Sequence, residues 1–239
     1  MNAFSKYIGS AALVLLTNAA VSANAADLPA KAYAPAPVTT QVYNWTGIYV
    51  GVNGGYGWGA QDPLTLLSNN LDRTSFNING GMFGGTIGAQ IQQGYVVLGL
   101  EGDLDWANIQ GNGISNPAVL GIPLGRLNIA TNTSAVMTAR ARVGAAMNNW
   151  LFYTTAGVAF DKSSANGTSL GAVACGAAGV LPNCSASSWR PGLAAGLGVE
   201  YAFMQNWSAK LEYLYIATVG SGVSTDHIDT VRAGINYRF

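Results

Sequence analysis

The sequence predicts an all-β fold, an eight-stranded antiparallel up-and-down transmembrane β-barrel with a filled polar interior. Apolar and polar residues alternate through eight segments, the connections alternate between short and long, and the charged residues keep to one phase of the alternation. Only 9% of the 239 residues are charged, against about 25% in an ordinary soluble domain. No run of about 18 apolar residues occurs beyond the amino terminus, so membrane-spanning helices are not expected.

The amino-terminal part of the chain has a different character from the rest. Residues 1–25 are typical of a secretory signal peptide, with a positively charged start, a short apolar stretch (Ile8–Ala20) and a small-residue cleavage motif (Ala23–Ala25). We expect cleavage after this motif and export from the cytoplasm. Residues 26–44 are rich in Ala and Pro, which predicts an extended periplasmic segment. The barrel is expected over residues 45–239.

The predicted strands are defined by a period of two, in which every second side chain is apolar or aromatic. The carboxy-terminal strand is the clearest case, because Val231, Ala233, Ile235, Tyr237 and Phe239 alternate with Arg, Gly, Asn and Arg. The full set of expected strands is Gly47–Gly59, Gly80–Gln92, Tyr95–Trp106, Ser134–Met147, Trp150–Asp161, Trp189–Phe203, Trp207–Ala217 and Val231–Phe239.

The connections between these segments favour a membrane barrel over a soluble sandwich. Three of them, at Gln92–Gly94, Asn148–Asn149 and Gln205–Asn206, are short and polar, as tight hairpins require. The four that lie between are long: Ala60–Asn79, Ala107–Thr133, Lys162–Ser188 and Thr218–Asp226. Short turns at one end and long loops at the other are typical of bacterial outer-membrane barrels.

The charged residues of the predicted strands occupy the polar phase. A Lys or Arg on the lipid face costs about 2–4 kcal/mol at the bilayer midplane, whereas enclosed charges can pair with one another. We therefore expect an ion-pair network inside a barrel too narrow for an open pore. Asp229 is the exception, because it lies on the apolar phase, near the long-loop end of its strand. The expected network consists of Glu101, Asp103, Asp105, Arg140, Arg142, Arg190, Glu200, Lys210, Glu212, Arg232 and Arg238.

All six tryptophans fall at segment ends, which predicts two aromatic girdles at the membrane surfaces. Trp45, Trp150 and Trp207 lie at the short-turn side of the predicted barrel. Trp58, Trp106 and Trp189 lie at the long-loop side.

Several stretches resemble the small eight-stranded outer-membrane proteins of alphaproteobacteria. They are Ala26–Pro29, Trp45–Gly51, Trp207–Tyr213 and Gly234–Phe239. The resemblance implies a bacterial outer-membrane location in contact with the lipid bilayer and lipopolysaccharide. It also implies that Tyr237 and Phe239 form the signal read by the barrel-assembly machinery. The family includes surface antigens and haemin-binding proteins.

The function expected from the sequence is non-enzymatic, a contribution to envelope structure and surface properties. A haemin-binding surface protein is the alternative, with His227, the only histidine, as candidate ligand at the outer rim. A small porin-like channel is a third hypothesis. Ser224, Asp226 and His227 are close in sequence, but adjacent strand residues point apart, which disfavours a catalytic triad.

Few further ligands or partners are expected. The net charge of zero gives no reason to expect a nucleic-acid partner, and no cofactor is expected. Cys175 and Cys184 lie in the third long loop, and in an exported protein such a pair predicts a disulfide. With no His or further Cys nearby, a metal site is not expected there.

Overall fold

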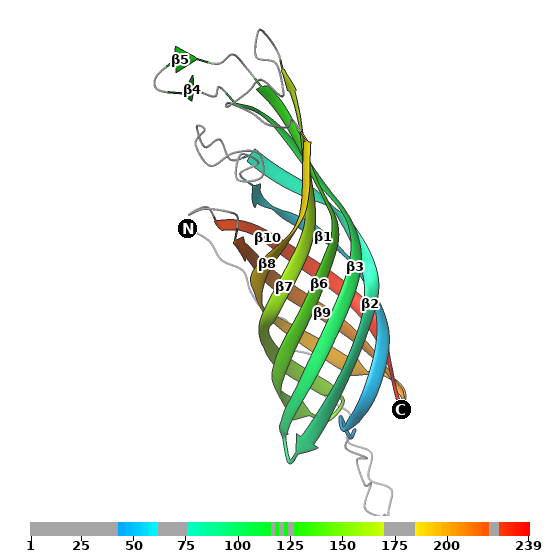
Figure 1. Ribbon diagram of the computed structural model, residues 1–239. Helices are drawn as coiled ribbons and strands as arrows, with labels where there is room; N and C mark the ends of the chain where they lie inside the picture. Colours follow the sequence, from blue (N-terminus) through cyan, green and yellow to red (C-terminus); the bar gives the residue numbers. More distant parts are fainter. Residues whose placement is uncertain are drawn as a thin grey trace, which may run out of the picture. The chain divides into compact units, whose positions relative to one another are not determined.

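The computed structural model describes residues 43–61, 76–115, 118–119, 122–123, 127–169, 185–219 and 225–239. Eight antiparallel strands close into a barrel, in which each strand pairs with its neighbours along the chain and the first pairs with the last (Figure 1). The predicted up-and-down barrel is confirmed. In these residues there is no helix long and apolar enough to span a bilayer.

The barrel strands follow one another around the ring in the order β1-β2-β3-β6-β7-β8-β9-β10. A separate two-stranded piece, β4–β5, lies in the connection between β3 and β6. The bounds are β1 Gly47–Gln61, β2 Phe76–Gln93, β3 Val96–Ser115, β4 Ala118–Val119, β5 Ile122–Pro123, β6 Leu127–Met147, β7 Trp150–Ser169, β8 Ser185–Ala202, β9 Trp207–Val219 and β10 Thr225–Arg238.

The short turns have the backbone conformation that their residues favour. Gly94, between β2 and β3, has φ of 62°, and Asn148, between β6 and β7, has φ of 54°. Gly and Asn are the residues that adopt this left-handed conformation at least cost. Tight turns at these positions hold neighbouring strands in register from one end of the barrel.

Three strands extend much further than the sequence pattern predicted. Most of the stretch Ala107–Thr133, expected as a loop, continues β3 or forms the start of β6, and β7 runs eight residues past Asp161. In Figure 1 these strands continue beyond the ends of β9 and β10. Most of their outward positions carry polar side chains in place of apolar ones, with Ile114 and Ala130 as exceptions, so the hydrophobic period ends while the backbone pairing continues. Bulges occur near the change, between Trp106 and Ile109 and between Thr133 and Ala135.

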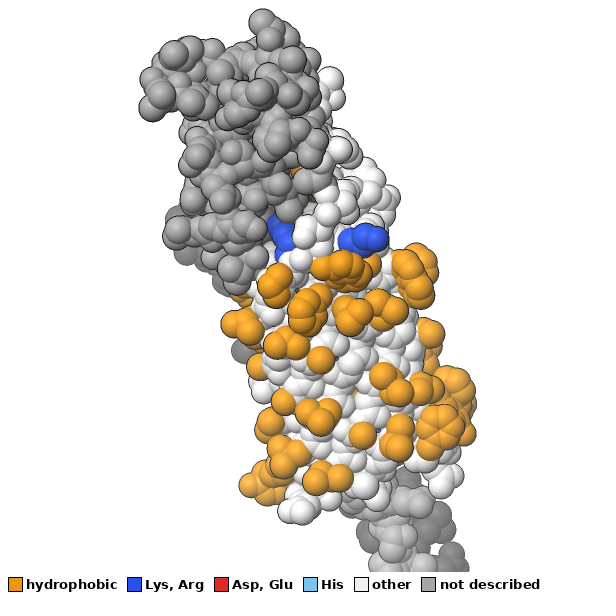
Figure 2. Space-filling model, in the orientation of Figure 1, with side chains coloured by type: hydrophobic (Ala, Val, Ile, Leu, Met, Phe, Trp, Pro, Cys, Tyr) orange, Lys and Arg blue, Asp and Glu red, His pale blue; other side chains and the backbone are white. Residues whose placement is uncertain are grey.

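The outer wall of the barrel is apolar over a height that matches a bilayer. Along β7, the outward apolar side chains run from Trp150 to Phe160, a distance of ten residues. With a rise of about 3.3 Å per residue and a strand tilt of about 40° from the barrel axis, these residues span roughly 25 Å of the bilayer. Figure 2 shows hydrophobic side chains spread over this zone, with Lys and Arg side chains at its upper border. Thirty-four large apolar or aromatic side chains are exposed here and at the barrel ends, which in water would be an aggregation hazard.

Inside the barrel, glycines leave space for large side chains from other strands. A Cβ built on Gly88 would overlap the ring of Tyr49, which is buried. At Gly81, on the outer phase of the same strand, a Cβ would meet no atom within 4 Å.

We therefore predict that Gly88→Ala destabilises the barrel by about 1–3 kcal/mol, because the added methyl group forces a packed aromatic ring to move. Urea unfolding in detergent micelles, followed by tryptophan fluorescence, measures this difference. Gly81→Ala is the matched control and should unfold close to the wild type. Equal effects of the two substitutions would contradict the proposed close packing.

Candidate functional site: a closed and layered barrel interior

The middle of the barrel interior is an ionic layer centred on Arg140. Its Nη2 atom lies 2.6 Å from Glu101 and 2.5 Å from Asp103, and its Nη1 atom bonds Glu212. All four side chains are buried. Because Glu212 lies on β9 and Arg140 on β6, this contact crosses the interior.

Other ion pairs tie opposite walls of the barrel together. Lys210 Nζ lies 3.2 Å from Glu101, and these residues are on β9 and β3, four strands apart in a ring of eight. Arg232 of β10 lies 2.7 Å from Asp105 of β3. The Lys210–Glu101 pair crosses the full diameter and occupies the lumen at this level.

Neutral polar groups complete the hydrogen bonding of Glu101, Asp103 and Glu200. Tyr49 donates its hydroxyl proton to Glu101 over 2.7 Å. Thr86 and Thr138 each donate to Asp103 over 2.8 Å. Ser208 (2.5 Å) and Asn236 (3.0 Å) donate to Glu200, which also bonds Arg142. A buried ion pair is tolerated when its remaining lone pairs are satisfied in this way.

Asp161 is an interior charge that was not among the predicted network residues. It is fully buried on β7, and its Oδ2 atom lies 2.7 Å from Arg190 Nη2 on β8. The sequence pattern could have placed Asp161 in the interior, because it shares the polar, inward phase of β7 with Tyr153 and Thr155. With Asp161 included, six buried cations face six buried anions.

The structure places the eleven predicted network residues inside the barrel, each at most 4% exposed. Ten of them lie close to one another in the ionic layer or beside it, with Arg238 at its turn-side margin, 3.7 Å from Glu200. Arg190 lies apart from them, on the long-loop side with Asp161.

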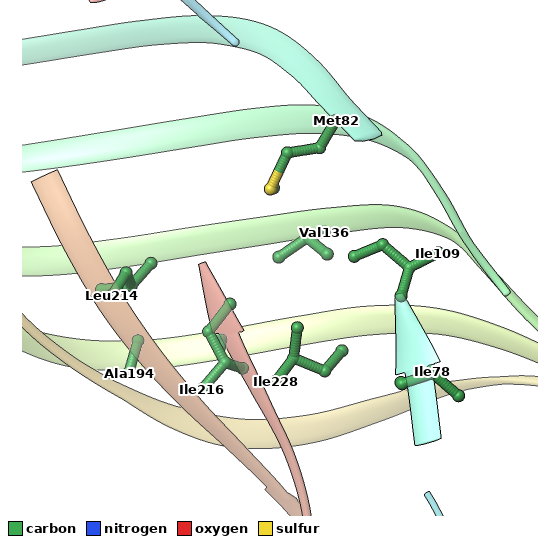
Figure 3. Packing of buried hydrophobic residues seen from close by; sticks show 9 residues of the cluster. Ile78, Met82, Ile109, Val136, Ala194, Leu214, Ile216 and Ile228 are labelled. Carbon is green, nitrogen blue, oxygen red and sulfur yellow. The ribbon is translucent and has the colours of Figure 1, made fainter. Parts of the chain in front are cut away.

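An apolar layer separates the ionic layer from the long-loop end of the barrel (Figure 3). It receives side chains from seven of the eight barrel strands, and Gly57 of β1 also faces it. The sequence pattern did not predict this layer, because its members share the phase of the charged residues. They are Ile78, Met82, Ile109, Val136, Ala159, Ala194, Leu214, Ile216 and Ile228.

A third layer of aromatic and apolar side chains fills the short-turn end. Trp45 is 0% exposed and packs with Tyr43, Leu151 and Tyr153. The guanidinium of Arg238 lies 4.7 Å from the Trp45 ring centroid. The assignment of Trp45 to an outer girdle is therefore wrong. The chain before β1 brings this indole into the barrel interior. There it covers the inward side chains at the short-turn end of the strands.

Comparison with known proteins identifies the family. Residues 11–239 match the family model described as outer membrane protein beta-barrel domain. The chain belongs to this family. The 31 kDa outer-membrane immunogenic protein of Brucella melitensis is 29% identical, covering 92% of this chain and 95% of that protein. The 22 kDa outer membrane protein of Rhizobium leguminosarum bv. viciae is 29% identical over 72% of this chain and 64% of its own length.

Among solved structures, Neisserial surface protein A is similar, with a TM-score of 0.44, 15% identity, and coverage of 81% of this chain and 98% of that one. The predicted resemblance to small alphaproteobacterial outer-membrane barrels is confirmed by the relatives and the family match. The protein is located in the bacterial outer membrane.

In this outer-membrane barrel, the other five tryptophans lie on the outside. Each is between 41% and 56% exposed. Trp150 packs against Tyr201 with ring centroids 4.6 Å apart, and Trp106 stacks on Phe83 at 5.8 Å. Rings that are exposed and paired in this way suit the headgroup region, so the girdles remain the expectation for these five residues.

His227 and Asp229 are on the outward phase of β10, near its loop-side end. The imidazole of His227 stacks on the ring of Tyr215, with centroids 6.0 Å apart. Asp229 accepts a hydrogen bond from the hydroxyl of Tyr213. Both side chains belong to the outer wall, and His227 does not point into the interior.

Some predicted residues fall outside the part of the chain that can be described. These are the signal and linker residues 1–42, the cysteines Cys175 and Cys184, and Ser224. Tyr43, which belongs to the predicted periplasmic segment, contacts Trp45 and Arg238. Among the described residues, no group of His, Cys, Asp or Glu is placed to hold a metal ion.

The central role of Arg140 leads to a prediction. Arg140→Met leaves Glu101, Asp103 and Glu212 without the cation that they share, so unfolding should become easier by about 3–5 kcal/mol. Urea unfolding in detergent micelles measures the change. Lys162→Met removes an exposed cation beyond the apolar zone and should alter stability by no more than about 0.5 kcal/mol. A similar small effect at Arg140 would show that the network does not hold the barrel together.

Proposed function

We propose that this protein is a closed, non-enzymatic barrel that contributes to the structure and surface properties of the outer membrane. The observation that carries the proposal is the filled interior. An ionic layer with pairs across the barrel lies between an apolar layer and an aromatic layer. A hydrophobic constriction resists wetting, and ions passing it would have to lose their hydration.

The arrangement of polar groups supports a structural role over catalysis. The buried carboxylates are held by arginines, a lysine and hydroxyl donors within the wall, and an apolar layer lies between them and the loop side. A catalytic carboxylate needs access to substrate. His227, the candidate haemin ligand, is stacked on Tyr215 at the outer wall, which gives the haemin-binding alternative no specific support.

Two measurements test the proposal together. Purified protein, shown to be folded by heat-modifiable gel mobility, should give no ion-conducting steps in planar lipid bilayers, because the interior is closed at three levels. Deletion of the gene should increase leakage of periplasmic proteins and sensitivity to detergent, and the wild-type copy should restore both. Stepwise conductance of the wild type would overturn the closed barrel, and a deletion strain with an unaltered envelope would overturn the structural role.

A further inference from the structure

The parts of β3, β6 and β7 beyond the apolar zone form a sheet with an unusual outer face. In the described side chains of residues 107–114, 128–134 and 163–168, there is no charged group, and the exposed cation Lys162 lies on the same face at the border with the apolar zone. Ordinary soluble surfaces carry about a quarter to a third charged residues. Figure 2 shows the visible part of this region in white, beyond the orange zone.

Side-chain amides dominate this outer face, and the strand register places them in two rows. In one row, Gln110 lies beside Asn132, which lies beside Ser164. In the next row, Asn112 and Asn166 flank Ala130 on its two sides. Rows on one face are about 7 Å apart, and neighbouring strands are about 4.8 Å apart.

The first row continues across both neighbouring strands. Asn79 of β2 pairs with Gln110, and Ser187 of β8 pairs with Ser164. Asn79 and Ser187 are both exposed. The face therefore carries a band of amide and hydroxyl groups over five strands. We call it the amide platform, and it consists of Asn79, Gln110, Asn112, Ala130, Asn132, Ser164, Asn166 and Ser187.

The amide platform contains a hollow of about 460 Å³, lined by Gln110, Asn112, Ala130, Asn132 and Asn166. The methyl group of Ala130 forms a low point between two taller asparagines. The Oδ1 atom of Asn132 is buried and has no protein hydrogen-bond donor. A buried acceptor without a donor is uncommon.

We propose that the amide platform binds a neutral, hydroxyl-rich saccharide. Each amide presents both a donor and an acceptor, the pair that matches two adjacent hydroxyl groups of a sugar ring. Beyond Lys162, the described part of the platform carries no cation, which disfavours anionic ligands, because these call for Arg or Lys. The spacing of neighbouring strands places one polar group beside each successive ring of an extended oligosaccharide.

The position of the platform supplies a source for such a ligand. It begins directly beyond Trp58 and Trp106, because Trp58 pairs with Asn79 and the bulge after Trp106 leads into this part of β3. Trp58 and Trp106 belong to the girdle expected at the outer membrane surface, so the platform lies at the level of the saccharides there. The proposal does not depend on the structural role proposed above, since a closed barrel without that role could still bind a glycan.

The test uses the full-length protein in lipid nanodiscs, with ¹⁵N-labelled side-chain amides observed by NMR. Two probes are titrated separately, a set of uncharged glucose and mannose oligosaccharides and an uncharged oligosaccharide fraction prepared from the cell's own lipopolysaccharide. We expect saturable shifts of the amide signals of Asn112, Asn132 and Asn166. Tighter binding of the second probe would identify the envelope as the source, and tighter binding of the first would identify an external glycan.

Two variants and a control make the result decisive. The triple substitution Asn112→Ala, Asn132→Ala and Asn166→Ala should weaken binding at least tenfold, because it removes the groups that contact the sugar. Ala130→Arg leaves these amides in place but fills the hollow, and should also abolish binding. Gln93→Ala with Gln205→Ala removes two exposed amides from the turn end of the barrel and should leave affinity unchanged.

Three outcomes would overturn the proposal. The first is the absence of any shift with every uncharged saccharide at millimolar concentration. The second is binding that survives both the triple variant and Ala130→Arg. The third is binding restricted to charged saccharides or to a protein, because neither requires an uncharged face of amides. Heat-modifiable gel mobility of each variant confirms that it has folded.

Discussion

The structure depends on one constraint: charged side chains in a membrane barrel must be enclosed and paired. Enclosure alone would not be enough, since an unpaired buried charge destabilises a protein by several kcal/mol. Here six cations and six anions occupy one phase of the eight strands. The same phase supplies Tyr49, Thr86 and Ser208, whose hydroxyl groups complete the carboxylate contacts. The apolar outer wall and the ionic interior are therefore two consequences of one alternation.

The pairs across the barrel also determine what the interior can do. Glu101 receives Arg140 from the neighbouring strand β6 and Lys210 from the opposite side of the ring. Contacts of both kinds fix the diameter and fill the lumen at the same level. The apolar layer of Ile109, Leu214 and Ile216 then separates these charges from the loop side, and Trp45 covers the turn side. This filled interior is the basis for the proposal of a role in the envelope and at the surface in place of transport.

Much of this could be predicted from the sequence because a β-strand has a period of two. The phase of Arg232 or Glu212 is fixed by its apolar neighbours, so the side on which each charge lies follows from the pattern alone. The ring of eight strands followed from the alternation of short and long connections. Asp161 obeys the same rule and could have been included, since its phase matches that of Tyr153.

Other features could not be predicted, for different physical reasons. Trp45 lies outside the strands, so no period constrains it, and its buried position results from contacts with residues distant in sequence, such as Leu151. The extensions of β3 and β7 carry polar side chains on their outer face, and backbone pairing leaves no hydrophobic signature there. The side chains of the apolar layer point inward, as the charged side chains do. Leu214 and Lys210 have the same phase on β9 and differ only in their position along the barrel axis, which the period of two does not show.

The assignment of inner and outer faces can be tested with the methionines that the chain already contains. Met137 and Met147 are outward, 42% and 62% exposed, whereas Met82 is 5% exposed within the apolar layer. In bicelles with protonated acyl chains and a deuterated protein carrying ¹³C-labelled methionine methyl groups, nuclear Overhauser effects report lipid contact. Acyl-chain signals are expected at Met137 and Met147, and none is expected at Met82. Lipid contact at Met82, or none at Met137, would contradict it.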